Sequence, residues 1–145
     1  MIVGIKAGCF TLIHSGHIWA IQQCVKKCDY LIILINDDEY VRQKKGCVPL
    51  TAEERKYILS NIKGVKEVHV FHGKTEHEWI KDFKLNIFPY KFGKTSALYL
   101  FHSDELKDKR PVPGEPYANA IYFIPKIDSP MRVSVTDIFK IIQEG

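Results

Sequence analysis

The sequence lacks a hydrophobic run long enough to cross a membrane. A membrane-spanning helix needs about 20 consecutive apolar residues, whereas the longest run here, residues 30–35, has only the length of a strand. The start of the chain also shows no secretory signal pattern. We therefore expect a cytoplasmic protein without a membrane partner.

Several site patterns are missing as well. No two of the four cysteines form a Cys-x-x-Cys pair, which indicates reduced thiols rather than a zinc knuckle or a disulfide framework. A P-loop is excluded because Gly93-Lys94-Thr95 would need a glycine at position 88, where Phe88 stands. The formal net charge of +4 is spread along the chain, so we expect an anionic small molecule as partner and no nucleic acid.

What the chain does contain is an alternation of strand-like and helix-like segments. The apolar patterning predicts strands over residues 2–7, 30–35, 65–71, 85–90 and 120–124. It predicts helices over residues 16–28, 51–61, 75–83, 96–107 and 135–143, and a basic loop over residues 42–50. The 145 residues suffice for one compact domain. We predict a single-domain α/β fold over residues 1–145: a doubly wound, Rossmann-like parallel sheet with helices on both faces.

The most informative segment is His14-Ser15-Gly16-His17, where the first strand passes into the first helix. Backbone N–H groups in a first helical turn lack partners, and the helix dipole favours an anion there. Gly8 allows a sharp turn off the strand, and Gly16 has no Cβ to keep a ligand away. Imidazoles three residues apart project to one helix face and can each donate a hydrogen bond. This predicts a phosphate grip, although the same spacing also occurs on helix surfaces and in metal sites.

The run Gly8-Cys9-Phe10-Thr11-Leu12-Ile13-His14-Ser15-Gly16-His17 resembles the Gly-x-Phe-Asp-x-x-His-x-Gly-His signature of the cytidylyltransferase-like nucleotidyltransferases, glycerol-3-phosphate cytidylyltransferases and sugar-phosphate adenylyltransferases among them. The resemblance implies that both histidines are catalytic. It further implies nucleotide binding by Gly8, Cys9, Phe10 and Gly16. Thr11 stands where cytidylyltransferases commonly have aspartate, and it takes an acceptor-binding position.

Two other segments extend the resemblance. Lys44-Lys45-Gly46 is similar to the family's Lys-Gly, which implies a catalytic Lys45 near the phosphates and an acceptor-binding Lys44. Arg55 of the Glu54-Arg55 pair is then a nucleotide ligand or a helix-surface arginine. Ser134-Val135-Thr136-Asp137-Ile138 resembles the C-terminal Ser-Thr-[Ser/Thr]-x-Ile element, which implies nucleotide contacts from Arg132, Ser134, Val135 and Thr136.

Four polar segments are expected to meet at one edge of the sheet. Ligands of open parallel sheets bind beyond the carboxyl ends of the strands. Four segments follow or precede predicted strands at that edge. They are residues 8–17, residues 36–38 with the acceptor-binding candidate Asp37, residues 44–46 with Arg55, and residues 132–136.

The resemblance also implies a reaction. The phosphate of an acceptor attacks the α-phosphorus of a nucleoside triphosphate and pyrophosphate leaves, so catalysis consists of positioning and charge neutralisation. We expect transfer of CMP from CTP to a phosphorylated small molecule, with Mg²⁺ accompanying the triphosphate; relatives often form homodimers. The alternatives are an adenylyltransferase that uses ATP with nicotinamide mononucleotide or a sugar phosphate, a catalytically inactive nucleotide-binding sensor, and a flavodoxin-like binding module.

Overall fold

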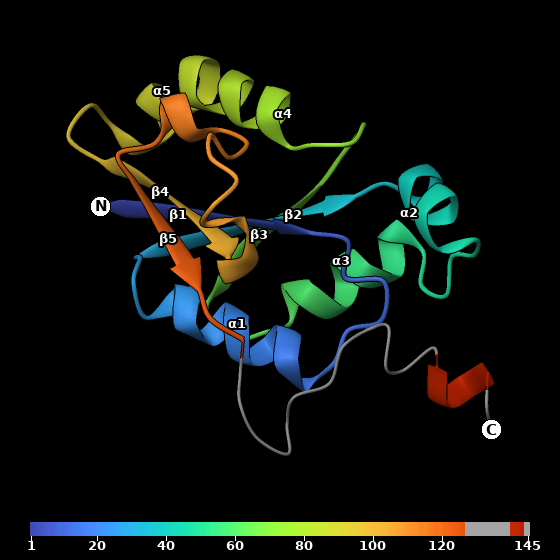
Figure 1. Ribbon diagram of the computed structural model, residues 1–145. Helices are drawn as coiled ribbons and strands as arrows, with labels where there is room; N and C mark the ends of the chain where they lie inside the picture. The colour runs from blue at the N-terminus through green and yellow to red at the C-terminus, as the bar shows by residue number, and fades with distance from the viewer. Residues whose placement is uncertain (127–139, 144–145) are drawn as a thin grey trace.

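The computed structural model describes residues 1–126 and 140–143, and these form a five-stranded sheet between two layers of helices (Figure 1). The strands are β1 (Ile2–Gly8), β2 (Tyr30–Asn36), β3 (Val65–Phe71), β4 (Ala97–Ser103) and β5 (Ala120–Ile124). The helices are α1 (Ser15–Val25), α2 (Asp38–Lys45), α3 (Ala52–Ser60), α4 (His77–Asp82) and α5 (Phe88–Phe92), with a π-helical turn η1 (Phe83–Ile87) and 3-10 turns η2 (Asp104–Leu106) and η3 (Glu115–Tyr117).

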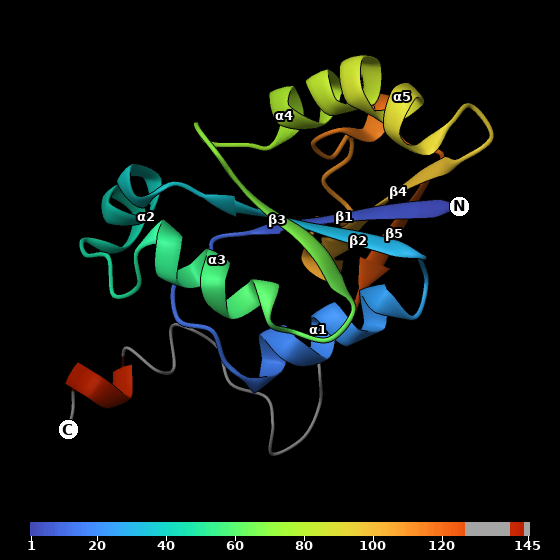
Figure 2. The same ribbon diagram turned by 180° about the vertical axis from the view of Figure 1, so that it is seen from behind.

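The strand order is β3-β2-β1-β4-β5, and every neighbouring pair is parallel. The chain winds outward from β1 through β2 to β3 and then returns to β4 on the other side of β1. Helices α1 and α3 cover one face, and α4, η1 and α5 cover the other, as both views show (Figures 1 and 2). The predicted doubly wound fold is confirmed, and its change of direction lies between β1 and β4, where such sheets bind ligands.

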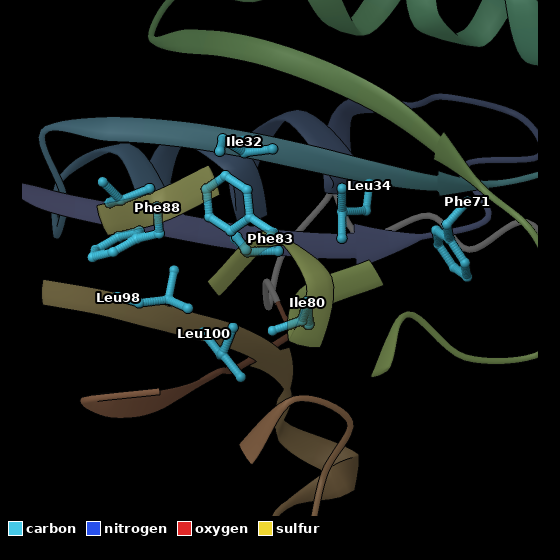
Figure 3. Close-up of a cluster of buried hydrophobic side chains, with 10 residues drawn as sticks. Ile32, Leu34, Phe71, Ile80, Phe83, Phe88, Leu98 and Leu100 are labelled. Atoms are coloured by element: carbon cyan, nitrogen blue, oxygen red, sulfur yellow. The ribbon is translucent and has the colours of Figure 1, made fainter. Parts of the chain in front are cut away.

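Two apolar cores fill the space on either side of the sheet. The core on the α4 side contains Ile80 and Phe83 together with Leu98 and Leu100 of β4 (Figure 3). Val3 and Ile5 of β1 belong to the same cluster. The α1 side holds a second core, which includes Phe101. Residues 31–36 of β2 are all buried, as expected of a central parallel strand covered on both faces.

The middle of the chain departs from the sequence prediction. Residues 85–90 are not a strand: Leu85 and Ile87 are exposed, while Phe83 and Phe88 enter the core from a helical path. The predicted helix over 96–107 is instead β4 with η2 after it, and the predicted loop over 42–50 contains the end of α2. Strong local patterns were overridden here by packing against the sheet.

Other boundaries agree closely with the prediction. Strands β3 and β5 have the predicted limits, and Thr51 caps α3 by accepting a hydrogen bond from the Glu54 N–H. The predicted closing helix begins outside the described residues, of which 140–143 are helical. No helix in the described part of the chain has both the length and the apolar character to cross a membrane.

Candidate functional site

The passage from β1 into α1 is a fixed loop. Gly8 is the last residue of β1, and Phe10 has a positive φ of 50°, which is a strained conformation for a residue with a side chain. The Phe10 ring lies in the core on the α1 side, with its centroid 5.1 Å from that of His17 in an edge-to-face arrangement. Thr11 is buried as well, only 1% exposed. Apolar packing therefore holds the loop in place.

Two histidines cap α1. His14 is the N-cap, and its Nδ1 accepts a hydrogen bond from the Gly16 backbone N–H at 3.1 Å. The Nδ1 of His17 accepts one from the His14 N–H at 3.2 Å. The rings stack with their centroids 3.9 Å apart. The pair satisfies two orphan backbone donors of the helix start and is held as one unit.

These hydrogen bonds decide where each ring carries its proton. A ring nitrogen that accepts a hydrogen bond holds no hydrogen, so the neutral forms of both rings are protonated on Nε2. Burial, then the neighbouring His14 and Lys6, lowers the pKa of His17 to about 4, and burial lowers the pKa of His14. At neutral pH each ring is thus an uncharged donor through Nε2–H. Such donors at the start of a helix suit an anion.

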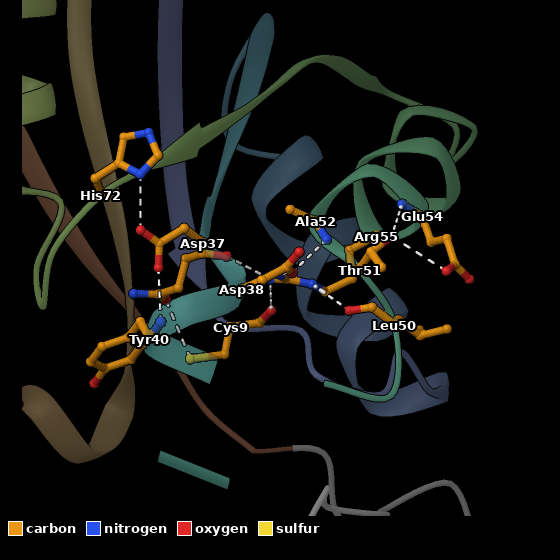
Figure 4. A network of polar contacts seen from close by, with 11 residues as sticks. Cys9, Asp37, Asp38, Tyr40, Leu50, Thr51, Ala52, Glu54, Arg55 and His72 are labelled. Atoms are coloured by element: carbon orange, nitrogen blue, oxygen red, sulfur yellow. Dashed lines mark hydrogen bonds and ion pairs between the residues drawn. The ribbon is translucent and has the colours of Figure 1, made fainter. Parts of the chain in front are cut away.

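A buried arginine ties this loop to the end of β2 (Figure 4). The Arg55 Nη1 donates to the carbonyl oxygens of Cys9 at 2.8 Å and Asn36 at 2.7 Å, and its Nε donates to the Leu50 carbonyl at 3.1 Å. Its Nη2 lies 2.9 Å from the Asp38 Oδ1. Arg55 is 0% exposed. The expectation that Arg55 binds nucleotide is therefore corrected: four of its donor bonds are used inside the protein.

The carboxylates that follow β2 also have partners (Figure 4). Asp37 is the N-cap of α2, where its Oδ1 accepts from the Tyr40 N–H at 2.9 Å and its Oδ2 lies 2.9 Å from the Nδ1 of His72. The hydrogen bond from Tyr40 is the largest cause that lowers the pKa of Asp37. The Asp38 Oδ1 accepts from both Arg55 and the Ala52 N–H. Asp37 keeps its place at the predicted edge, but its carboxylate is already engaged.

Lys44 and Lys45 lie in the last turn of α2, which ends at Gly46 with a left-handed φ of 81°. The Lys44 Nζ is 5.9 Å from the centre of the Tyr40 ring. Burial raises the pKa of Cys9, and the charges of Lys44, Arg55 and Lys45 oppose that rise. Both exposed lysines are therefore within electrostatic reach of the β1–α1 loop, on a helix rather than on the predicted loop.

Three of the four predicted polar segments thus meet at the carboxyl edge of the sheet. Residues 132–136, with Arg132, Ser134, Val135 and Thr136, lie outside the described residues. Two roles need correction besides that of Arg55. The side chains of Phe10 and Thr11 are directed into the interior, so neither offers its side chain to a ligand, whereas Gly8, Cys9 and Gly16 are half-buried at the surface of the loop.

Asn36, in the segment expected at this edge, contacts the loop: its Oδ1 accepts from the Cys9 thiol at 3.3 Å, and its carbonyl accepts from Arg55. Sequence reasoning missed two other residues of this edge. Lys6 lies on β1 two residues before Gly8. His72 follows β3 and contacts Asp37. Their position at or near strand ends was the available signal, because parallel strands end at one edge.

A protein-built metal centre is not found in the described residues. Within 1–126 and 140–143, no group of three or more His, Cys, Asp or Glu side chains could hold an ion. Asp37 and Asp38, the carboxylates that follow β2, already accept hydrogen bonds. The donor set therefore suits an anion better than a bare metal ion.

Comparisons with known proteins agree with the fold and with the family resemblance. The family model described as Cytidylyltransferase-like matches residues 5–141. The bifunctional protein HldE of Caulobacter vibrioides is 36% identical over 87 residues, which are 59% of this chain and 18% of that protein. HldE of Desulfatibacillum aliphaticivorans is 42% identical over 82 residues, 55% of this chain and 17% of that protein. HldE of Nitratiruptor sp. is 32% identical over 105 residues, which are 71% of this chain and 22% of that protein. The chain spans about a fifth of the length of these curated relatives.

Solved structures share the architecture. The lipopolysaccharide core biosynthesis protein from Thermoplasma volcanium has a TM-score of 0.67 at 19% identity, covering 88% of this chain and 99% of that one. The NadR protein in complex with NAD and AMP-PNP has a TM-score of 0.58 at 19% identity, and the match covers 98% of this chain and 42% of that one. At such identities the likeness shows the fold alone. Since the family model covers nearly all of the sequence, including the histidine pair, this chain belongs to the cytidylyltransferase-like family.

Proposed function

We propose that this protein is a nucleotidyltransferase, which moves a nucleoside monophosphate from a nucleoside triphosphate to a phosphorylated small molecule. The observation that carries the proposal is the stacked histidine pair at the start of α1, with both Nδ1 atoms engaged by backbone N–H groups. Both rings are left to donate through Nε2. Membership of the cytidylyltransferase-like family supports the same chemistry, and so does the likeness in fold to a bifunctional NMN adenylyltransferase/ADP ribose pyrophosphatase.

The reaction needs positioning more than proton transfer. An oxygen of the acceptor phosphate forms a bond to the α-phosphorus, and the bond from that phosphorus to the bridging oxygen of the β-phosphate breaks. The electron pair leaves with pyrophosphate. Because the attacking phosphate is already ionised near neutral pH, no general base is required.

Each residue of the site then has a role. The Nε2–H groups of His14 and His17 donate to phosphate oxygens, and Lys45 supplies positive charge from α2. Charge that develops on the leaving phosphates is stabilised by donors that are already oriented. Arg55 acts indirectly, because it holds the Cys9 carbonyl and the end of β2 in place.

Mg²⁺ is part of this proposal as a companion of the triphosphate. When bound, it would neutralise phosphate charge, and this hard ion often keeps several waters and contacts substrate phosphates. The described residues, which form no metal cage, suit an ion delivered by the nucleotide.

The base of the nucleotide divides the proposal into two candidates. The resemblance of residues 8–17 and 44–46 to cytidylyltransferases favours CTP. ATP is the second candidate, favoured by the adenine nucleotides bound in similar structures: AMP-PNP in NadR, and AMP in a bifunctional NMN adenylyltransferase/ADP ribose pyrophosphatase from Francisella tularensis, which has a TM-score of 0.57 at 15% identity and covers 99% of this chain and 42% of that one.

Pyrophosphate release tests both the reaction and the base. The wild-type chain is assayed with each of the four common triphosphates and a panel of phosphorylated acceptors, including sugar phosphates and nicotinamide mononucleotide. We expect acceptor-dependent release with CTP or ATP. Triphosphate binding without release would favour the sensor, and absence of any nucleotide binding would favour the binding module.

A matched pair of histidine variants tests the site. His17→Ala should lose about 100-fold or more in kcat, as expected when one preorganised donor is removed. His69→Ala is the control, because the half-buried His69 binds Glu67 on β3 and contacts Trp79. A folded His17→Ala protein with near-normal turnover would contradict the assignment.

A further inference from the structure

Lys6 is a half-buried cation that has no ion-pair partner among the described residues. It lies in the middle of the sheet on β1, with β2 on one side and β4 on the other. Among the residues that the structure describes, no ion pair within 4.0 Å joins it to a carboxylate. A buried charge without a partner is costly, so a lysine at this position calls for an explanation.

The strand register places Lys6 on the α1 face of the sheet. Lys6 stands opposite Phe101 of β4, and opposite residues of paired strands project to the same face. Phe101 belongs to the core under α1, with Cys24. Gly4, two residues before Lys6, points the same way, since a Cβ there would lie 2.9 Å from the Sγ of Cys28. The lysine stem therefore runs between β1 and α1.

The ammonium acts on the same helix that carries the histidine pair. Its charge helps to lower the pKa of His17, although burial is the larger cause. Burial also lowers the pKa of Lys6 itself, against the opposing influence of Cys24 and Glu76. A long side chain that buries its stem extends its charged end toward a polar opening, and the carboxyl end of β1 lies two residues further along.

The histidine pair leaves a need for such a charge. Both rings are neutral at neutral pH, so they supply dipoles but no net positive charge, and Lys44 and Lys45 approach from α2, beyond β2. We propose that Lys6 is a phosphate-binding residue, whose ammonium contacts the nucleotide phosphates held by His14 and His17. This inference rests on the proposed function, since it takes the nucleoside triphosphate as the ligand.

The test replaces the charge by an apolar side chain of similar length. Lys6→Met should weaken binding of the triphosphate (ATP and CTP, measured separately by calorimetry) and of inorganic tripolyphosphate by about tenfold or more, as for loss of a hydrogen bond to a charged group. The unliganded variant should be at least as thermostable as the wild type, because a half-buried charge that forms no ion pair among the described residues has been removed. Lys26→Met is the control, because Lys26 is exposed at the C-cap of α1.

Two further measurements separate a direct role from a structural one. Lys6→Arg, which keeps the charge, should recover part of the lost affinity. In unliganded Lys6→Met, the NMR-titrated pKa of His17 should rise, because a nearby positive charge is gone. Unchanged affinity of Lys6→Met for the nucleotide and for tripolyphosphate would overturn the inference. If the wild type binds nucleotide but releases no pyrophosphate, the proposed function fails while the affinity comparison still decides the role of Lys6.

Discussion

Replacing Arg55 by methionine should unfold this protein far more easily, although Arg55 was a candidate phosphate ligand by sequence. Its guanidinium joins three backbone carbonyls and one carboxylate from four separate positions of the chain. Methionine fills a similar volume but donates no hydrogen bond. The Cys9, Asn36 and Leu50 carbonyls and the Asp38 carboxylate would all lose a donor.

The magnitude follows from the groups left without partners. Each buried polar group that loses its hydrogen bond costs about 1–3 kcal/mol, and breaking a buried ion pair by removing one partner costs about 3–5 kcal/mol. Because these values are not additive, we expect a total of about 4 kcal/mol. For a domain of this size that corresponds to a fall in Tm of about 10–15 °C.

Urea and thermal unfolding of Arg55→Met and the wild type measure this loss. Arg42→Met is the matched control, because Arg42 is exposed on α2 and its replacement should change the free energy of unfolding by less than about 0.5 kcal/mol. A stable Arg55→Met protein that has lost only nucleotide affinity would refute the reasoning, since Arg55 would then act on the ligand directly.

Three other predictions concern stability. Hydrogen bonds from Lys91, Tyr30 and His69 outweigh burial and lower the pKa of Glu67 to about 2. The stabilising effect of the Glu67 carboxylate is therefore complete above its unfolded pKa and is lost as the pH falls from about 4.5 toward 2. Glu67→Gln should lower the free energy of unfolding at pH 7 by about 1–3 kcal/mol, and a difference between variant and wild type that does not depend on pH would contradict this. His17, with a pKa lowered to about 4, should destabilise the fold as the pH falls from about 6.5 to 4, and in His17→Gln that part of the acid sensitivity should vanish. Gly64 and Gly73 both have positive φ, but a Cβ at Gly64 would lie 2.7 Å from the Val25 Cγ1, whereas one at Gly73 meets nothing within 4 Å. Gly64→Ala should therefore lower the free energy of unfolding by about 1–3 kcal/mol more than Gly73→Ala does. Equal losses for the two variants in denaturant titrations would exclude the clash.

The parts of the fold that sequence could predict are those with strong local signals. The apolar run of β2 is typical of a buried parallel strand, and Thr51 followed by Glu54 is typical of a helix start. The histidine motif is found where a strand passes into a helix, which predicted β1 and α1. These features predicted the parallel sheet, its doubly wound topology and the edge of the sheet at which the candidate site lies.

The rest depended on contacts that are distant in sequence. Leu98, Leu100 and Phe101 fit a helix pattern as well as a strand pattern, and only pairing with β1 makes them a strand. Arg55 carries no local sign that it will reach Cys9, 46 residues away. Likewise, only the folded structure shows that Lys6 has no ion-pair partner in the part of the chain that is described.

The central claim is that two neutral imidazoles at the start of α1 donate through Nε2 to nucleotide phosphates. Long-range ¹H–¹⁵N NMR of His14 and His17 tests it most directly, without nucleotide and with saturating ATP or CTP. We predict the Nε2–H form for both rings in the free protein, and a change of both Nε2 resonances when the nucleotide binds. Rings protonated on Nδ1, or Nε2 resonances that stay unchanged in a nucleotide-saturated protein, would contradict the claim.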